Sequence, residues 1–289
     1  MRTGNSVPLS TLETIRGCDA TLFGAVSSPS NKVEGYRSAI VTMRKTFDLF
    51  ANLRPVCSFP IPESRPNIDL MIVRENTEGL YSGRESWQEE ENTAVAERVI
   101  TRKGSQRIAE MAFHLASNRR KHVTLVHKAN VLPLTCGLFR TVGLEVAKRN
   151  PQIRCDELLV DTMAMRLIKD PETFDVIVTT NLFGDILSDE ASQLVGGLGL
   201  AASANVGNET AIFEPVHGSA PDICGQGIAN PLATILASAL LLDYLGYRQQ
   251  STNLQHAVHS LLSNGHVTPD LGGSMTTCQV TDAMIRCLH

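Results

Sequence analysis

The 289-residue sequence lacks the features that mark several broad classes of protein. No apolar run reaches the roughly 20 residues that are needed to span a bilayer. The formal net charge of -4 leaves no basic excess for nucleic acid and no polybasic patch for a membrane surface. We therefore expect neither nucleic acid nor membrane as a partner.

The amino-terminal residues, MRTGNSVPLS, contain neither an apolar signal core nor an arginine-rich presequence. With no targeting signal in the chain, we expect a cytoplasmic protein if the source is bacterial and a mitochondrial one if it is fungal. The seven cysteines are scattered without a C-x-x-C pair, which favours reduced thiols over a zinc site or disulfides. The dinucleotide fingerprint G-x-G-x-x-G is also absent.

Short β-branched runs alternate with helical patterns, which predicts an α/β fold. Ala20 to Val26 has the character of a buried strand. Three further apolar runs are each followed by a polar residue: 68–73 by Arg74, 123–127 by Lys128, and 174–180 by Asn181. Open α/β sheets place ligand sites at the carboxyl ends of their strands.

Asp185 and Asp189 form the sharpest local signal, in the segment NLFGDILSDEAS. They are four residues apart on a predicted helix, so both carboxylates project from one face. Two hard oxygen ligands on one face suit Mg²⁺ or Mn²⁺. Spacing alone also allows a pair of solvated acids near a helix start, favoured by the helix dipole. Asp161, which follows another apolar stretch, is the third candidate acid.

Arg44, Arg54 and Arg74 are candidates for binding a substrate with several carboxylates, because a guanidinium binds a carboxylate through two parallel hydrogen bonds. From sequence alone they could equally be three unrelated surface arginines. Lys128 beside a metal and arginines could have a lowered pKa and act as a base. Tyr81 is a candidate acid partner.

Four segments occur in an order that resembles the isocitrate, isopropylmalate and homoisocitrate dehydrogenases: VRENTEGLY, HKANVL, NLFGDILSD and the loop EPVHGSAPDI. The resemblance extends from Ala20 to TPDLGG, Thr268 to Gly273. It implies that a 2-hydroxy acid is oxidised by hydride transfer to a nicotinamide, loses its β-carboxylate, and is protonated as an enol.

The resemblance also implies roles for individual residues. Asp185 and Asp189 would bind Mg²⁺ or Mn²⁺ together with Asp161 of a partner subunit, and the cation would act as a Lewis acid. Lys128, also from the partner, would remove the hydroxyl proton, and Tyr81 would protonate the enol. The remaining substrate contacts would come from the three arginines, Ser28, Val41 and Asn130, and Asn130 would also lie near the nicotinamide ribose.

NAD is the expected cofactor. NADP-linked members of the family continue the HG-x-AP loop with Lys-Tyr, whereas this chain continues with Asp222-Ile223. An aspartate accepts hydrogen bonds from a free ribose 2′-hydroxyl and repels a 2′-phosphate. The cofactor residues expected from the resemblance are Glu214, His217, Gly218, Ser219, Ala220, Asp222, Asn230 and Asn130.

The helix before Arg44 bears on substrate choice. Isocitrate enzymes place Ser and Asn there, whereas this chain has Ser38 and then Ile40. Isopropylmalate enzymes place a Leu-Leu pair against the isopropyl group, where this chain has Ile40 and Val41, preceded by Arg37. The preceding SSPSNKVEGY, with Ser28, resembles homoisocitrate dehydrogenases. We therefore expect homoisocitrate as substrate, with isopropylmalate second and overlap between them plausible.

The family's opening strand and GDGIG-type loop are not found, and the sequence begins about 60 to 70 residues into the family pattern, if the missing part is a βαβ unit and more. We therefore keep two hypotheses, an active dehydrogenase and a truncated non-catalytic relative that acts as a binding or partner subunit. In either case we expect an isopropylmalate-dehydrogenase-like fold with a central mixed sheet. Its large domain would comprise 1–52 and 197–289, and its small central domain 53–196. The small domain would carry the dimer interface and a clasp arm at about 82–102.

Overall fold

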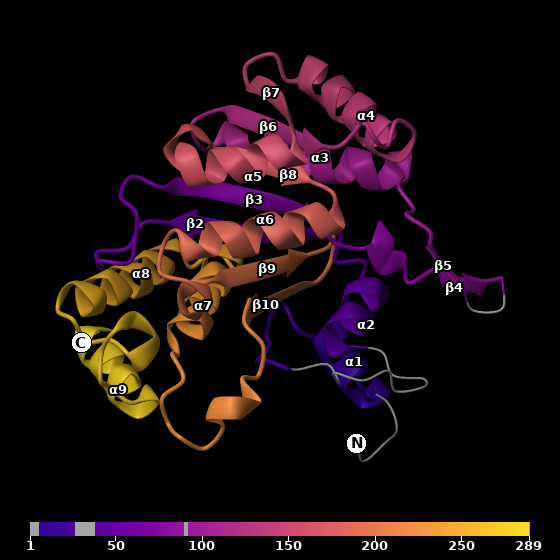
Figure 1. Ribbon diagram of the computed structural model, residues 1–289. Coiled ribbons are helices and arrows are strands. Elements are labelled where there is room, and N and C mark those ends of the chain that lie inside the picture. The colour runs from indigo at the N-terminus through magenta and orange to yellow at the C-terminus, as the bar shows by residue number, and fades with distance from the viewer. Residues whose placement is uncertain (1–5, 27–37, 90–91, 289) are drawn as a thin grey trace. The chain divides into compact units, whose positions relative to one another are not determined.

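The computed structural model describes residues 6–26, 38–89 and 92–288 (Figure 1). The chain divides into two compact units. The first unit comprises Met1–Leu49, Cys57–Ile68 and Ser192–His289, and the second comprises Phe50–Val56 and Asp69–Ala191. The segment 57–68, which we had placed in the central domain, belongs to the first unit.

The first unit combines a short set of strands with helices. Its elements are α1 (Leu9–Arg16), β1 (Thr21–Leu22), α2 (Ala39–Thr46), β9 (Ala202–Val206), β10 (Ala211–Pro215), α7 (Leu232–Tyr244), α8 (Arg248–Ser263) and α9 (Thr277–Leu288). The strands lie in the order β1-β10-β9, with β1 parallel and β9 antiparallel to β10. The buried residues Val258, Leu261 and Val280 of α8 and α9 form the centre of one hydrophobic cluster.

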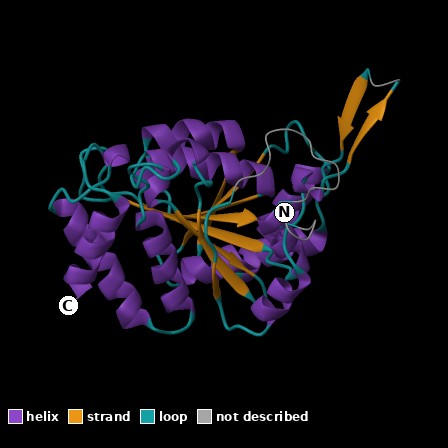
Figure 2. Ribbon diagram, turned by 90° about the horizontal axis from the view of Figure 1, so that it is seen from below, coloured by secondary structure: helices purple, strands orange, loops and turns teal. Residues whose placement is uncertain are grey.

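The second unit has helices packed on a run of strands (Figure 2). Its elements are β2 (Ala51–Cys57), β3 (Asp69–Glu75), β4 (Glu85–Gln88), β5 (Thr93–Ala96), α3 (Arg102–Ser117), β6 (His122–His127), α4 (Thr135–Arg149), β7 (Arg154–Leu159), α5 (Val160–Lys169), β8 (Val176–Thr179) and α6 (Asn181–Gln193). The strand order is β2-β3-β8-β6-β7. Strands β3, β8, β6 and β7 are all parallel. A core around Phe113 and Phe139 fills the space between α3, α4 and these strands.

The observed strands confirm the α/β class, and the parallel and antiparallel pairs make the sheet a mixed one. The apolar runs predicted before Lys128 and Asn181 are β6 and β8. The third run, β3, continues through Arg74 to Glu75, so Arg74 lies within a strand rather than after one. Because β3, β6 and β8 are parallel, their carboxyl ends share one edge.

The prediction of a buried strand over Ala20–Val26 is wrong in length and burial. The strand itself covers only Thr21 and Leu22 among the described residues, Phe23 adds one backbone hydrogen bond to Phe213 of β10, and Leu22 is exposed. An edge strand with a single neighbour needs to bury only part of its surface, so its apolar letters overstate its burial.

Residues 82–102 contain β4 and β5, an antiparallel pair separate from the other strands of its unit. The pair extends away from the helices and strands of the unit in both views (Figures 1 and 2). Trp87 on β4 is 61% exposed. Among the described helices, none has both the length and the apolar character needed for crossing a membrane.

Candidate active site

Asp185 and Asp189 lie on α6, which starts directly after β8. Arg54 of β2 is buried and contacts both acids, donating from Nη2 to Asp185 at 3.2 Å and from Nη1 to Asp189 at 3.0 Å. Its remaining donors reach Ser188 at 2.6 Å and Asn52 at 2.7 Å. One guanidinium therefore bridges the two carboxylates that the sequence had singled out.

Arg74 brings a second guanidinium to the same helix. Its side chain is 1% exposed, pairs with Asp185, and donates twice to Asn181 Oδ1, at 3.0 and 2.8 Å. Gly184 makes this approach possible, because a Cβ at that position would lie 2.7 Å from Cβ and Cγ of Arg74. The close packing of Arg74 therefore explains the glycine at position 184 of NLFGD.

Tyr81 completes the group, since its hydroxyl donates to Asp185 Oδ2 at 2.5 Å and its ring stacks 5.1 Å from the Arg74 guanidinium. Burial, followed by the hydrogen bond to Asp185, raises the pKa of Tyr81 above its ordinary value of 10.0. The phenol therefore stays protonated at neutral pH, as a proton donor must.

Glu75 positions the loop that carries Tyr81. This carboxylate is 2% exposed and accepts hydrogen bonds from the backbone N–H groups of Thr77 at 3.0 Å and Glu78 at 2.9 Å. Sequence reasoning missed Glu75 and gave Asn181 no role. Both stand within segments that had been singled out, VRENTEGLY and NLFGDILSD, so their polarity at a strand end was the available signal.

Lys128 and Asp161 form a separate group. Lys128 follows β6, Asp161 lies in the first turn of α5, and their side chains pair at 2.5 Å. The hydrogen bond from Lys128 is the largest cause that lowers the pKa of Asp161. Asn130, in the loop after Lys128, is exposed.

The carboxylate pair fits a hard divalent cation, since it offers oxygen ligands on one helical face. Burial raises the pKa of Asp189, and Asp185 raises it further although Arg54 acts in the opposite direction. The Asp189 side chain is still 54% exposed, and a cation would offset its repulsion from Asp185 as well as its partial loss of solvent. Within the described parts of the chain, no three His, Cys, Asp or Glu side chains are grouped as metal ligands. A third ligand such as Asp161 would therefore have to come from elsewhere.

Arg44 belongs to the first unit, whereas Arg54 and Arg74 belong to the second. On α2 it is buried and donates to Asn205 at 2.9 Å and to Glu214 at 3.1 Å. Glu214, a predicted cofactor residue, is thus engaged in a buried ion pair on β10.

Some of the residues expected to influence substrate choice are described by the structure and others are not. Val41 is half-buried on α2, and Ile40 packs against the core formed by Met43, Leu49 and Ile212. Packing in this core is enough to explain an apolar residue at position 40, without any contact to the substrate. Ser28 and Arg37 lie outside the described residues.

The predicted cofactor loop surrounds a cavity of about 840 Å³ in the first unit. The predicted residues that line it are His217, Gly218, Ser219, Ala220 and Asn230; Asp222 and Glu214 are not among the lining residues. The sequence had not indicated Asp270, which also lines the cavity and accepts a hydrogen bond from Asn230 at 3.0 Å. Its segment, TPDLGG, was nevertheless among those that carried the resemblance.

Two details suit this cavity to a polar ligand. The Nε2 atom of His217 is buried and has no hydrogen-bond partner among the described residues. Gly199 lets Asp270 approach the backbone closely, because a Cβ there would lie 2.5 Å from Asp270 Oδ2. The cavity therefore offers at least one unused polar atom to a ligand.

Comparison with known proteins decides the family. Residues 1–285 match the model of the isocitrate/isopropylmalate dehydrogenase family. The chain belongs to this family. It is 54% identical over 288 residues to an isocitrate/homoisocitrate dehydrogenase of Thermus thermophilus, covering 99% of this chain and 86% of that protein. The predicted resemblance and the prediction of a dehydrogenase are thereby confirmed.

Other members of the isocitrate/isopropylmalate dehydrogenase family with similar sequence identity to this chain have different names. A 3-isopropylmalate dehydrogenase of Methanothermobacter thermautotrophicus is 50% identical over 290 residues, covering 100% of this chain and 86% of that protein. The crystal structure of isocitrate dehydrogenase from Methylococcus capsulatus superposes with a TM-score of 0.94 at 45% identity, covering 98% of this chain and 85% of that one. The fold is shared, while the substrates in these names differ.

Proposed function

We propose that the chain catalyses the NAD-dependent oxidative decarboxylation of a 2-hydroxy di- or tricarboxylate, with homoisocitrate converted to 2-oxoadipate as the first choice. One observation carries the proposal: Arg54, Arg74 and Tyr81 converge on the Asp185–Asp189 face of α6. Carboxylate-binding, proton-donating and cation-binding groups therefore share one place on the fold.

The arginines and aspartates balance one another's charge in this structure. A bound Mg²⁺ or Mn²⁺ would supply Lewis acidity at the substrate's C2 oxygen. With Asp185 and Asp189 engaged on a cation, Arg54 and Arg74 would direct their guanidinium N–H groups to substrate carboxylates. Tyr81, held protonated, would deliver its proton to the carbon that loses carboxylate.

Lys128 would serve as the base that accepts the substrate hydroxyl proton, with Asp161 holding its ammonium in place when it is charged. We propose that the pair acts on the site of a second copy of the chain. Large apolar side chains exposed beside it support a homodimer: Val131 and Leu134 follow Lys128, and Met165 and Ile168 share α5 with Asp161. Leu134 is 85% exposed, and together with the other three it adds to the apolar surface that a second copy would cover.

For the cofactor, we propose that the loop from His217 to Asn230 binds the adenosine half of NAD. The volume of its cavity and the unpartnered His217 Nε2 support this placement. Asp222, exposed at the 3₁₀ turn Pro221–Ile223, would accept from the ribose 2′-hydroxyl and repel the 2′-phosphate of NADP. We therefore expect a higher kcat/KM with NAD than with NADP.

Substrate choice rests on the sequence before Arg44 and on the similarity to an isocitrate/homoisocitrate dehydrogenase. The 3-isopropylmalate dehydrogenase at 50% identity keeps isopropylmalate as the alternative. The test is to measure kcat/KM for homoisocitrate, 3-isopropylmalate and isocitrate with NAD and Mg²⁺. The highest value with homoisocitrate is expected, and turnover of 3-isopropylmalate alone would overturn the choice.

The alternative of a non-catalytic subunit makes a different prediction. Such a chain would turn over none of the three substrates, yet it would still bind NAD or a partner chain. Absence of turnover in a chain that folds and binds NAD would favour it over the enzyme.

A further inference from the structure

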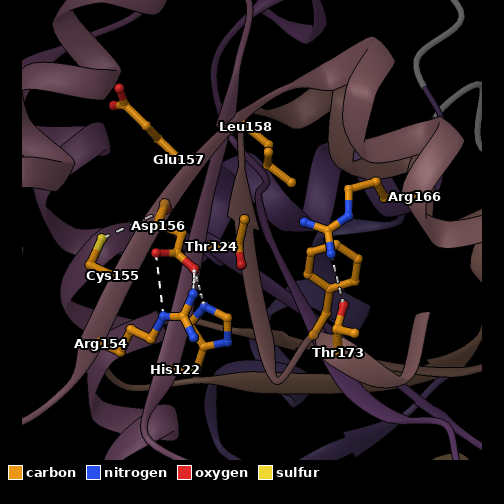
Figure 3. Close-up of a pocket in the computed structure, with 10 residues that line it drawn as sticks. His122, Thr124, Arg154, Cys155, Asp156, Glu157, Leu158, Arg166 and Thr173 are labelled. Atoms are coloured by element: carbon orange, nitrogen blue, oxygen red, sulfur yellow. Dashed lines mark hydrogen bonds and ion pairs between the residues drawn. The ribbon is translucent and has the colours of Figure 1, made fainter. Parts of the chain in front are cut away.

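A second cavity, of about 520 Å³, lies in the second unit (Figure 3). It is lined by His122 and Thr124 of β6, five consecutive residues of β7 (154–158), Arg166 of α5, and Thr173 and Phe174. Strands β6 and β7 are parallel, and Lys128 and Asp161 follow their carboxyl ends. His122 and Arg154 stand at the amino ends, so the cavity begins at the end of the strands away from the proposed base.

Thr124 lines this cavity and carries an unsatisfied hydroxyl. The residue is 1% exposed, and its Oγ1 atom is buried without a hydrogen-bond partner among the described residues. Figure 3 shows its side chain between the His122–Asp156 pair and the Arg166–Thr173 pair. A buried hydroxyl that lacks a partner destabilises the fold, so an occupant that accepts a hydrogen bond from it would be favoured.

Arg154 and Arg166 each have N–H donors that their hydrogen bonds to described residues do not use. Arg154 contacts Asp156 through Nε and Nη2, at 3.4 and 2.7 Å. Arg166 uses Nε and Nη2 on Asp170, and Nη2 on Thr173 at 3.3 Å. A guanidinium carries five N–H donors, and Nη1 of neither arginine is used in the hydrogen bonds of the described residues.

The acids of the cavity are already engaged. Asp156 accepts from Arg154 and lies 2.9 Å from His122 Nε2. Glu157 receives two hydrogen bonds of 2.7 Å from Arg140. These donors hold the pKa of both carboxyls below the ordinary range, although burial opposes the shift. The hydroxyl of Thr124 and the Nη1 groups of Arg154 and Arg166 are unused donors in the part of the chain that the structure describes, so the fitting occupant is one whose polar atoms are acceptors.

Nucleophilic chemistry at Cys155 is disfavoured, because burial, reinforced by Asp156 and Glu157, raises the pKa of its thiol to about 11. The thiol is therefore protonated at neutral pH and unreactive. The cavity is suited to binding rather than to covalent catalysis.

We propose that this cavity binds a small organic anion through carboxylate or phosphate oxygens, with the Thr124 hydroxyl and the guanidiniums of Arg154 and Arg166 as donors. The volume is in the range of sites for small metabolites. The binding does not depend on the proposed reaction, since none of the lining residues has a part in it.

Isothermal titration of the full chain with inorganic phosphate and, separately, with succinate tests the proposal and distinguishes the two sources of oxygen. Saturable binding of at least one probe is expected. Thr124→Val removes the hydroxyl at nearly constant volume, and it should weaken that binding about tenfold or more by removing a hydrogen bond to a charged group.

Arg154→Gln is a second variant whose folding is secure, because its side chain is 71% exposed. It should also weaken binding, whereas Arg149→Gln, the same charge change at an exposed position of α4, should not. The proposal is overturned if neither probe binds, or if Thr124→Val and Arg154→Gln bind as tightly as the unmodified chain. Equal weakening by Arg149→Gln would show general charge attraction and would equally overturn it.

Discussion

At the scale of single residues, Asp185 is the point where the interactions of the site meet. It receives hydrogen bonds from Arg54, Arg74 and Tyr81, while Asp189, one turn later, receives one from Arg54. Two guanidiniums thus stand where a divalent cation would otherwise balance the carboxylates. This arrangement makes the charge of α6 the sensitive quantity for both stability and metal binding.

Asp189→Asn should raise the melting temperature of metal-free protein. The folded-state pKa of Asp189 is raised, so at pH values above it the ionised carboxylate weakens the fold, and this cost disappears as the pH falls through that pKa. The amide removes the cost at neutral pH. Mg²⁺ should raise the melting temperature of the unmodified chain and leave that of the variant nearly unchanged. An equal response to Mg²⁺ in both would remove Asp189 from the cation site.

Tyr81→Phe should lower kcat by about 100-fold or more, the usual contribution of a positioned proton donor, with little change in NAD affinity. The raised pKa of Tyr81 adds a pH signature: the stability it confers is complete below pH 10.0 and is lost as the pH rises through the folded-state pKa. Alkaline unfolding followed by circular dichroism should therefore be less steep in the variant. An unchanged kcat would mean that another group donates the proton.

The candidate residues could be predicted because their types fit one chemistry and their segments resemble a family. Their partners could not. Nothing in the sequence indicates that Arg44 pairs with Glu214, or that Asp161 pairs with Lys128. The first pair is separated by 170 positions in the sequence and the second by 33, so these contacts become known only from the folded structure.

At the scale of elements, a glycine allows α6 to pack closely against β3. Gly184→Ala should destabilise the protein by about 1–3 kcal/mol, because the new methyl group would overlap with Arg74 Cβ and Cγ, which are anchored to the strand. Urea unfolding measures the change. Gly137→Ala on α4 is the matched control, since its Cβ would meet nothing within 4 Å and alanine favours helix. Equal destabilisation by both would contradict the account of α6 packing.

The sequence predicted elements best where burial is complete. Strands β6 and β8 are mainly apolar and are buried along nearly their whole length. Strand β7, with the letters RCDELL, has too many polar residues for such a pattern, because among the described strands it lies at an edge with β6 as its neighbour. The same edge position creates the cavity of Figure 3, which no sequence pattern indicated.

At the scale of the whole molecule, the account requires two copies of the chain. Lys128→Ala chains lack the proposed base, and Asp185→Asn chains lack a cation ligand, so each variant alone should be inactive. If the base acts on the partner's site, co-refolding the two variants should restore activity, up to about one quarter of that of the unmodified chain if copies pair at random. No recovery from properly assembled mixed dimers would place base and cation ligands in one copy.

The most direct test of the central claim is to measure NADH formation and CO₂ release together from homoisocitrate with the purified full chain. The account predicts one CO₂ for each NADH, a requirement for Mg²⁺ or Mn²⁺, and loss of both products in Asp185→Asn. NADH without CO₂, or equal rates after complete removal of divalent cations, would contradict a metal-assisted oxidative decarboxylation.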